Sequence, residues 1–352
     1  MAKDFIRPEV EGIKEYLPGK TPTEPGAVKL ASNENPFGPS PRALAAITAE
    51  LGKLQTYPDQ KSTLLREALA KKLGVSDRSV VCGNGSDDIM QVLASTYLNP
   101  GDEVVISKNT FSLYELVTRI FGGKLVLVDL KDNEISLDNI AKAITKKTKI
   151  IFLTNPNNPT GTIFSAEQFD SFIQKVPENI LVVVDEAYAG FVESKEFPNI
   201  INYVKEGKNV LVLRTFSKYY GLAGLRVGYG IAKEALISPM LKTKMPFNVN
   251  RLAQVGAAAA LEDKDFLEKT YQNNIEGKKC LYAELDKLSL SHKKTEANFI
   301  FVDIKKSADE MFLSLMKKGI IIRPLTSFGF PQAIRISIGT KEQNEKLIAA
   351  LS

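Results

Sequence analysis

Cysteine and histidine are scarce in this sequence of 352 residues, which contains two cysteines and a single histidine. Cys82 and Cys280 do not form a CxxC pair, so the sequence predicts neither a disulfide framework nor a thiolate zinc site. Since His292, in the polar stretch SLSHKKTEA, is the only histidine, a His-based zinc site or a Ser-His-Asp triad elsewhere in the chain is excluded as well. We therefore expect no metal centre, and any catalysis must use Lys, Asp, Tyr, Arg or a cofactor.

Long apolar runs are absent too. No run approaches the roughly 20 apolar residues of a membrane span, and the first residues, MAKDFIRPEVEG, lack the apolar core of a signal peptide. The net charge of +5 comes from 46 basic and 41 acidic residues, which are spread along the whole chain. Such a surface does not favour nucleic-acid binding, although it leaves room for anionic small molecules. We expect a reduced cytoplasmic protein that does not bind membranes.

The length and the changes of pattern along the chain predict two domains and an N-terminal arm. Residues 1–40 are rich in proline and glycine and predict an extended arm. Residues 41–245 predict a large domain, because short β-branched runs alternate there with amphipathic segments of helical period. Residues 246–352 predict a smaller α+β domain, since a long helical region (248–288) precedes three apolar strands and a closing helix.

Seven apolar runs between residues 79 and 231 predict the strands of the large domain. In chain order they are SVVCG, DEVVIS, KLVLVDL, KIIFLT, ILVVVDE, NVLVLRT and RVGYGIA. Because helical segments separate these continuously apolar runs, we expect an α/β fold with a mostly parallel seven-stranded sheet that helices cover on both faces. Ligands of such sheets bind beyond the carboxyl ends of the strands.

Three segments that follow these strands contain unusual residues. The loop CGNGSDD leads into a helix and suits a phosphate, but Asp88 replaces the third glycine of a dinucleotide-binding fingerprint. In NPNNPTG, two Asn-Pro pairs predict a rigid turn that holds Asn158. In DEAY, Asp185 ends an apolar strand, where a carboxylate is costly unless a cation meets it. Taken alone, each has a structural explanation that is at least as good: a glycine turn, a plain turn and a cap.

The segment RTFSKYYGLAGLRVGYG (214–230) gives these residues a common context. Lys218 lies just beyond the end of a strand, in the same crevice as Asp185 and the glycine loop. A lysine nucleophile, a buried carboxylate and a phosphate cradle together indicate pyridoxal 5′-phosphate (PLP) as the cofactor. Charge-assisted contacts to its phosphate are then expected from Thr215, Ser217 and Arg226.

Six motifs resemble those of the fold-type-I PLP-dependent aminotransferases and, within them, the histidinol-phosphate aminotransferase branch. They are SNENPFGPS, GNGSD, NPNNPTG, DEAY, TFSK…GLAGLRVGY and IRISIGT, and the match runs from about Tyr16 to Gly339. Any one motif is weak evidence, but all six occur in the family's order and spacing. The resemblance implies the fold-type-I architecture, PLP as the cofactor, and a homodimer with shared active sites.

The resemblance also implies roles for residues around the cofactor ring. Lys218 resembles the Schiff-base lysine, which also shuttles a proton, and Asp185 resembles the partner of the pyridine nitrogen. Tyr188 and Asn158 resemble the pair that hydrogen-bonds the ring hydroxyl. Phe111, in NTFSLY, resembles the aromatic residue that stacks on the ring. The predicted catalytic set is Lys218, Asp185 and Tyr188.

The implied phosphate-binding residues come from two segments and from a second subunit. Tyr57, in QTYPDQ, resembles a tyrosine that reaches the phosphate from the neighbouring subunit. The others are Gly85, Ser86, Asp87, Thr215, Ser217 and Arg226.

Two arginines of the C-terminal domain, Arg323 in IIIRP and Arg335 in AIRISIG, lie amid apolar strand residues. Such arginines often pair with a buried acid, but facing a PLP crevice they favour an anion clamp. Arg335 resembles the family's arginine for the substrate carboxylate or phosphate, and Arg323 resembles an auxiliary anion contact. Tyr16 resembles an N-terminal tyrosine that folds over the substrate, and Asn33 is a further predicted substrate-binding residue.

The resemblance implies amino transfer between L-histidinol phosphate and 2-oxoglutarate by a ping-pong reaction, which gives imidazole acetol phosphate and L-glutamate in histidine biosynthesis. An aromatic amino-acid aminotransferase and a phosphothreonine decarboxylase share most of the motifs and stay open as alternatives. The incomplete glycine fingerprint disfavours a nucleotide-dependent dehydrogenase, and the filled catalytic positions disfavour a non-catalytic binding protein. Two positions depart from the family's commoner pattern: Asp88 replaces a glutamate, and Phe111 cannot hydrogen-bond the cofactor as a tyrosine would.

Overall fold

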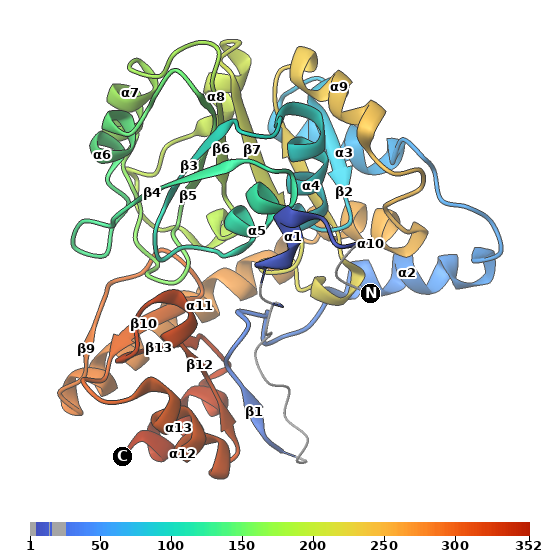
Figure 1. The fold of residues 1–352 in the computed structure, drawn as a ribbon. Coiled ribbons are helices and arrows are strands. Elements are labelled where there is room, and N and C mark those ends of the chain that lie inside the picture. The colour runs from blue at the N-terminus through green and yellow to red at the C-terminus, as the bar shows by residue number, and fades with distance from the viewer. Residues whose placement is uncertain (1–4, 14, 16–25) are drawn as a thin grey trace.

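The computed structural model describes residues 5–13, 15 and 26–352 (Figure 1). Its largest element is a seven-stranded sheet with the strand order β2-β8-β7-β6-β5-β3-β4. Each strand coincides with one of the seven apolar runs, which confirms the predicted α/β sheet. The strands are β2 (Val80–Gly83), β3 (Glu103–Ser107), β4 (Lys124–Val128), β5 (Thr148–Thr154), β6 (Leu181–Asp185), β7 (Val210–Thr215) and β8 (Gly228–Ile231).

The sheet is mostly parallel, as expected. Neighbouring strands from β4 to β7 run parallel to one another, and β8 is antiparallel to both of its neighbours, β2 and β7. All strands except β8 therefore end at the same edge of the sheet. The loops that follow β2, β5, β6 and β7 leave from this edge, which is where ligands of open α/β sheets bind.

Helices cover both faces of the sheet (Figure 1). Along β6, Leu181 and Val183 enter one apolar core whereas Val182 and Val184 enter the other, which explains why the strands are continuously apolar. The first core also contains α4 (Ser86–Tyr97), α5 (Leu113–Ile120) and α9 (Glu234–Thr243). The second contains α3 (Thr63–Leu73), α6 (Leu137–Lys142), α7 (Ala166–Ile173), α8 (Ile200–Lys205) and α10 (Arg251–Leu261).

Local sequence signals set the starts of several helices. α2 (Pro41–Glu50) begins after Ser40, whose Oγ accepts a hydrogen bond from the Ala43 backbone N–H at 3.1 Å, and it packs against α10. α7 begins with a capping box, in which Ser165 and Gln168 each accept a hydrogen bond from the other's backbone N–H. A short helix, α1 (Pro8–Glu11), precedes these elements.

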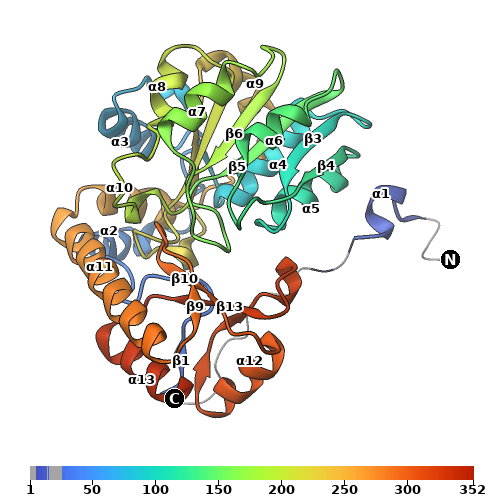
Figure 2. The same ribbon diagram turned by 90° about the vertical axis from the view of Figure 1, so that its left-hand side faces the viewer.

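The C-terminal residues form a smaller α+β unit beside the carboxyl edge of the large sheet (Figure 2). Its main sheet is antiparallel, in the order β12-β13-β10-β9, and β1 (Val28–Lys29) pairs in parallel with β11 (Ile320–Ile321) in a second, two-stranded sheet. The other elements are β9 (Ser291–His292), β10 (Phe299–Asp303), α12 (Ala308–Lys317), β12 (Arg323–Pro324), β13 (Ala333–Ser337) and α13 (Lys341–Leu351).

Two details of this unit differ from the sequence-based expectation. The helical region 248–288 is divided into α10 and α11 (Lys264–Lys287), because the Asp263 side chain accepts a hydrogen bond from the Phe266 N–H and begins a new helix. The apolar run IIIRP is two strands rather than one, since its isoleucines pair with β1 and Arg323 pairs with β13.

Residues 26–40 connect the two units. Val28, Leu30 and Ala31 lie in the apolar core of the small unit, whereas Ser40 begins α2 on the large one. α11 also contacts both units, through residues 189–191 and through α13 (Figure 2). The domain boundaries expected at residues 40 and 245 stay predictions. Within the described ranges, no helix is long and apolar enough to cross a membrane, and no group of three His, Cys, Asp or Glu side chains is placed to hold a metal ion.

Candidate active site

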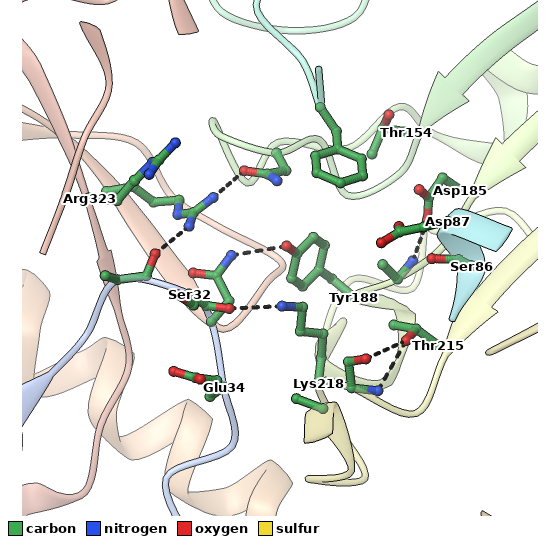
Figure 3. Close-up of a pocket in the computed structure, with 18 of the residues that line it drawn as sticks. Ser32, Glu34, Ser86, Asp87, Thr154, Asp185, Tyr188, Thr215, Lys218 and Arg323 are labelled. Carbon is green, nitrogen blue, oxygen red and sulfur yellow. Dashed lines mark hydrogen bonds between the residues drawn. The ribbon is translucent and has the colours of Figure 1, made fainter. Parts of the chain in front are cut away.

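A cavity of about 240 Å³ lies at the carboxyl edge of the large sheet, where residues 31–34 and the small unit close over it (Figure 3). Its walls come from elements that are spread over the whole chain, so it is the fold that assembles them. The residues proposed from the sequence that line the cavity are Asn33, Ser86, Asp87, Phe111, Asn158, Asp185, Tyr188, Thr215, Ser217, Lys218, Arg226, Arg323 and Arg335.

Lys218 follows β7 and points into this cavity (Figure 3). Its Nζ donates a hydrogen bond of 2.8 Å to the carbonyl oxygen of Ser32. Burial lowers the pKa of Lys218 to about 8, and the positive charge of Arg335 acts in the same direction. A substantial fraction of this amine is therefore neutral at mildly alkaline pH, and a neutral amine is both a nucleophile and a proton acceptor.

Asp185 is the last residue of β6 and is only 3% exposed. Its Oδ1 accepts a hydrogen bond from the Ala187 N–H at 3.0 Å, and its Oδ2 accepts one from the Tyr114 hydroxyl at 2.7 Å. Burial raises the pKa of Asp185 to about 6, although these two hydrogen bonds oppose the rise. A buried carboxylate of this kind is suited to a protonated ring nitrogen, which would supply the missing positive charge.

A polar recess lies where α4 begins. Gly85 precedes the helix with a φ of 85°, a conformation that favours glycine. Arg226 reaches the same place and donates hydrogen bonds to Asp87 Oδ2 at 3.2 Å and to Ser217 Oγ at 3.5 Å. Thr215 Oγ1 accepts from the Ser217 N–H at 3.1 Å. A helix N-terminus, two hydroxyls and a guanidinium are the donors that bind a phosphate group.

Tyr188 and Asn158 are held by residues from other parts of the chain. The Tyr188 hydroxyl accepts a hydrogen bond from Asn33 Nδ2 at 3.0 Å, and Asn33 Oδ1 accepts one from Ser337 Oγ at 2.9 Å. Asn158 Oδ1 accepts from Arg335 Nη1. Loops of the large sheet are therefore tied to the small unit and to residues 31–34 across the cavity.

Arg323 and Arg335 lie directly opposite each other on the antiparallel strands β12 and β13. Cross-strand partners project to the same face of a sheet, so both guanidinium groups reach the cavity. Arg335 is 6% exposed, donates to the Ala31 carbonyl oxygen at 2.7 Å and lies 5.2 Å from the ring centroid of Phe299. Two adjacent guanidinium groups are suited to bind an anionic substrate group.

Two of the described residues proposed from the sequence, Gly85 and Tyr57, do not line the cavity. Gly85 lies behind its wall, where an added Cβ would be 2.8 Å from Arg226 Nη2. Tyr57 is 77% exposed on the surface, and its ring stacks on that of Phe247 with centroids 4.6 Å apart. Tyr16 lies outside the described residues.

The sequence reasoning missed eight residues that line the cavity, namely Ala31, Ser32, Glu34, Tyr114, Thr154, Ala187, Ala223 and Phe328. Tyr114 lies in the first turn of α5, and its ring meets the edge of the Phe111 ring, which precedes the helix, at 5.8 Å. Ser32 contributes through its backbone carbonyl, for which the side-chain sequence has no signal. Glu34, beside Asn33, forms an ion pair of 2.8 Å with Lys29.

The comparisons with known proteins agree with this geometry. The family model "aminotransferase class I and II" matches residues 25–351. A histidinol-phosphate aminotransferase of Moorella thermoacetica is 46% identical over 98% of this chain and 92% of its own length, and one of Halalkalibacterium halodurans is 42% identical over 99% and 96%. The crystal structure of histidinol-phosphate aminotransferase from Sinorhizobium meliloti in complex with pyridoxal 5′-phosphate has a TM-score of 0.87 and 31% identity, over 92% of this chain and 90% of that chain. These matches span both units and the cavity between them, and the chain belongs to the aminotransferase class I and II family.

Proposed function

We propose that this protein is a PLP-dependent histidinol-phosphate aminotransferase, which transfers an amino group between L-histidinol phosphate and 2-oxoglutarate. Relatives with this activity that are 46% and 42% identical over nearly the full chain support the proposal. The structural observation that carries it is the position of the Lys218 amine. It lies between a recess for a phosphate on one side, at Ser86 and Thr215, and the strand that bears Arg323 on the other (Figure 3).

The donors around the cavity fit PLP. The recess formed by Ser86, Thr215, Ser217 and Arg226 would hold its phosphate, and it has room because Gly85 has no Cβ to displace Arg226. Asp185 would pair with the pyridine nitrogen, and Lys218 would attach to the aldehyde carbon. Phe111 would stack on the ring, and Asn158 and Tyr188 would bind the ring hydroxyl. When bound, PLP withdraws electrons from the substrate Cα, which makes loss of the Cα proton easier.

Lys218 would carry that proton. Its low pKa allows Nζ to accept a proton as the neutral amine and to donate it again as the ammonium group. The hydrogen bond to the Ser32 carbonyl keeps Nζ in the cavity. Asp185 would meanwhile maintain the positive charge of a bound ring nitrogen, and Asn33 holds the Tyr188 hydroxyl in place by its hydrogen bond.

Arg335 and Arg323 would bind the anionic end of each substrate. Histidinol phosphate presents a phosphate and no carboxylate, whereas 2-oxoglutarate presents two carboxylates. A guanidinium group binds either anion with two parallel hydrogen bonds, so one arginine pair serves both half-reactions. Arg323 and Arg335 lie on neighbouring strands of the small unit, so the same pair of side chains is available in both half-reactions.

We further propose a cytoplasmic homodimer with shared active sites. Exposed apolar side chains gather near Tyr57, at Leu51, Leu54, Met245 and Phe247, and a second subunit would bury them. Tyr57 would then face the cavity of the partner rather than its own. Cys82 and Cys280 are free thiols, as is usual in a reducing compartment.

The function is tested by single-turnover reactions of the PLP-loaded enzyme with histidinol phosphate, phenylalanine and phosphothreonine. Conversion of histidinol phosphate should be fastest by a wide margin, with glutamate formed when 2-oxoglutarate is added. Preferred conversion of phenylalanine would indicate an aromatic aminotransferase, and CO₂ release from phosphothreonine would indicate a decarboxylase.

A second experiment tests the role of Arg335. Arg335→Ala should lower kcat/KM in both half-reactions, because a charge-assisted contact worth about 2–4 kcal/mol is lost, which corresponds to roughly 30- to 1,000-fold. Arg335→Lys should also be impaired, since an ammonium group does not reproduce the two parallel hydrogen bonds. Arg78→Ala is the matched control, because the Arg78 side chain forms an exposed ion pair with Glu234 on the surface. Histidinol without its phosphate should be a poor substrate and nearly insensitive to the substitution; equal slowing of histidinol would mean that Arg335 is structural.

A further inference from the structure

Tyr114 is a fully buried residue of α5 that lines the cavity, and its hydroxyl is hydrogen-bonded to two other lining residues, Asp185 and Thr154. Its hydroxyl donates to Asp185 Oδ2 at 2.7 Å and accepts from Thr154 Oγ1 at 2.9 Å. Its ring stacks on Phe152 of β5 at 4.9 Å and meets the edge of Phe111 at 5.8 Å. The phenol is thus fixed on two sides and aimed at the end of β6.

We propose that Tyr114 is a positioning residue, which holds Asp185 in a single orientation and keeps its carboxylate ionised. The reason why Asp185 should be ionised rests on the proposed function, because a protonated ring nitrogen of PLP requires an ionised partner. Its physical content, however, concerns only residues of this chain and is testable without any cofactor.

The direction of the hydrogen bonds favours the ionised form. Since Thr154 donates to the Tyr114 oxygen, the Tyr114 proton is available to Asp185, and an ionised carboxylate accepts it well. A proton on Asp185 Oδ2 would face the Tyr114 proton and break this arrangement. Burial also raises the pKa of Tyr114 well above its usual range, so the phenol keeps its proton and can donate it at neutral and mildly alkaline pH.

The other groups around Asp185 act against ionisation or are too weak to secure it. Burial is the largest influence, and the negative charges of Asp87 on α4 and Glu186 after β6 add to it. Among the described residues, the Tyr114 hydroxyl and the Ala187 N–H are the groups that oppose the rise in the pKa of Asp185. Lys218 and Tyr188 also line the cavity. The phenol is therefore the main side-chain contact that keeps this carboxylate charged.

Packing alone does not require a tyrosine here. A phenylalanine would retain the stack on Phe152 and the contact with Phe111, and it would remove only the hydroxyl. Tyr114→Phe is thus a clean test of the hydrogen bond. Tyr97→Phe is the matched control, because its hydroxyl donates to the Leu236 carbonyl oxygen at 2.6 Å, away from the cavity.

The first experiment is a carboxyl titration of the cofactor-free protein by NMR with ¹³Cγ-labelled aspartate, in which Asp185→Asn identifies the signal. In Tyr114→Phe the pKa of Asp185 should rise by about one to two units, as expected for a lost hydrogen bond to a charged group. Thr154→Val, which leaves the Tyr114–Asp185 bond in place, should give a smaller rise in the same direction. Tyr97→Phe should give none. An unchanged pKa of Asp185 in Tyr114→Phe overturns the proposal.

The second experiment measures the affinity for pyridoxamine 5′-phosphate, which cannot attach covalently to Lys218, as a function of pH. The ionisable groups of the ligand titrate in the same way with the parent and with Tyr114→Phe. A difference between the two pH dependences of affinity therefore comes from the protein. Tyr114→Phe should bind about tenfold more weakly near pH 6.5 and equally well near pH 9. A loss that is the same at all pH values would indicate a merely structural role and would overturn the proposal. If the parent does not bind this ligand at all, the proposed function fails, whereas the NMR titration still decides the role of Tyr114.

Discussion

Burial acts on Lys218 and Asp185 in the same sense, toward the neutral form. It lowers the pKa of Lys218 to about 8 and raises the pKa of Asp185 to about 6. At neutral pH, both side chains of the cofactor-free protein are therefore mostly charged, although their buried environment disfavours the charged form of each. Such local instability is typical of sites that are arranged for a bound group of complementary charge.

Asp185→Asn should stabilise the cofactor-free protein at alkaline pH while it impairs amino transfer. Because the folded-state pKa of this acid is raised from 3.8 to about 6, its destabilising effect is fully present above pH 6 and disappears as the pH falls toward 4. Urea unfolding should show a gain of about 1–3 kcal/mol at pH 8 and much less at pH 4.5. The surface substitution Asp129→Asn, which removes an exposed ion pair with Lys108, should not show this pH dependence. A loss of stability at pH 8 would contradict the prediction.

Single residues of the site were predictable where a motif places a charged or amide side chain at the carboxyl end of an apolar strand. Lys218, Asp185 and Asn158 are of this kind, since each lies at the carboxyl end of an apolar strand or within four residues of it. Tyr114 was not predictable as a partner of Asp185, because the contact depends on how far β5, β6 and α5 are apart in space. Ser32 was not predictable for a different reason: every residue has a carbonyl oxygen, so sequence does not distinguish the one that meets a lysine.

Among the elements, the start of α4 combines a backbone requirement with a close contact. Gly85 needs a positive φ to turn the chain from β2 into the helix, and it also lies against the guanidinium group of Arg226. The helix N-terminus and the arginine are thereby brought to the same recess. Substitution of this glycine is expected to disturb both.

Gly85→Ala should lose folding stability and cofactor affinity together. The positive φ costs an alanine about 1–2 kcal/mol, and the new Cβ would push Arg226 out of the recess. Gly101→Ala is the matched control, since Gly101 has a φ of 90° and no atom within 4 Å of the added Cβ. Both variants should unfold at lower urea concentration, but only Gly85→Ala should release PLP more readily in dialysis. Equal PLP retention by the two variants would contradict the role of Arg226.

The elements of the large sheet were predictable because each strand is buried on both faces and is therefore a continuous apolar run. The helices between them followed from their apolar period. The pairing of β1 with β11 could not be anticipated, since a two-residue strand such as Val28–Lys29 has no periodicity and its partner is remote in the chain. For the same reason the division of IIIRP into β11 and β12 was missed.

On the scale of the whole molecule, the cavity is closed by residues from both units, whereas Tyr57 lies on the outer surface. The exposed apolar residues near Tyr57 are contributed by two segments, 51–57 and 245–247, that the Tyr57–Phe247 stack joins. One chain by itself therefore does not bring Tyr57 to the cavity, and the proposed homodimer would account both for Tyr57 and for these exposed apolar residues.

Mixing two inactive parents should restore activity if Tyr57 serves the neighbouring subunit. In a dimer of Lys218→Ala with Tyr57→Ala, one site contains both an intact Lys218 and an intact Tyr57. Random mixing should then recover roughly a quarter of the parental sites, because half of the dimers are mixed and each has one good site of two. Amino transfer after co-refolding is the measurement. No recovery from dimers shown to be mixed would mean that each chain completes its own site.

The pairing of β1 with β11 joins residues from nearly opposite ends of the chain, and synthesis of a protein begins at its N-terminus. The large sheet is complete once β8 has been made, so Lys218 and Asp185 can take their places early. Ser32 and Asn33 can reach their final positions only after β11 and β13 have been made, because those strands anchor the segment that contains both residues. The cavity therefore cannot be completed on the ribosome until β13 (Ala333–Ser337) has been made. A chain that stops before residue 320 would expose its reactive lysine at an uncovered sheet edge.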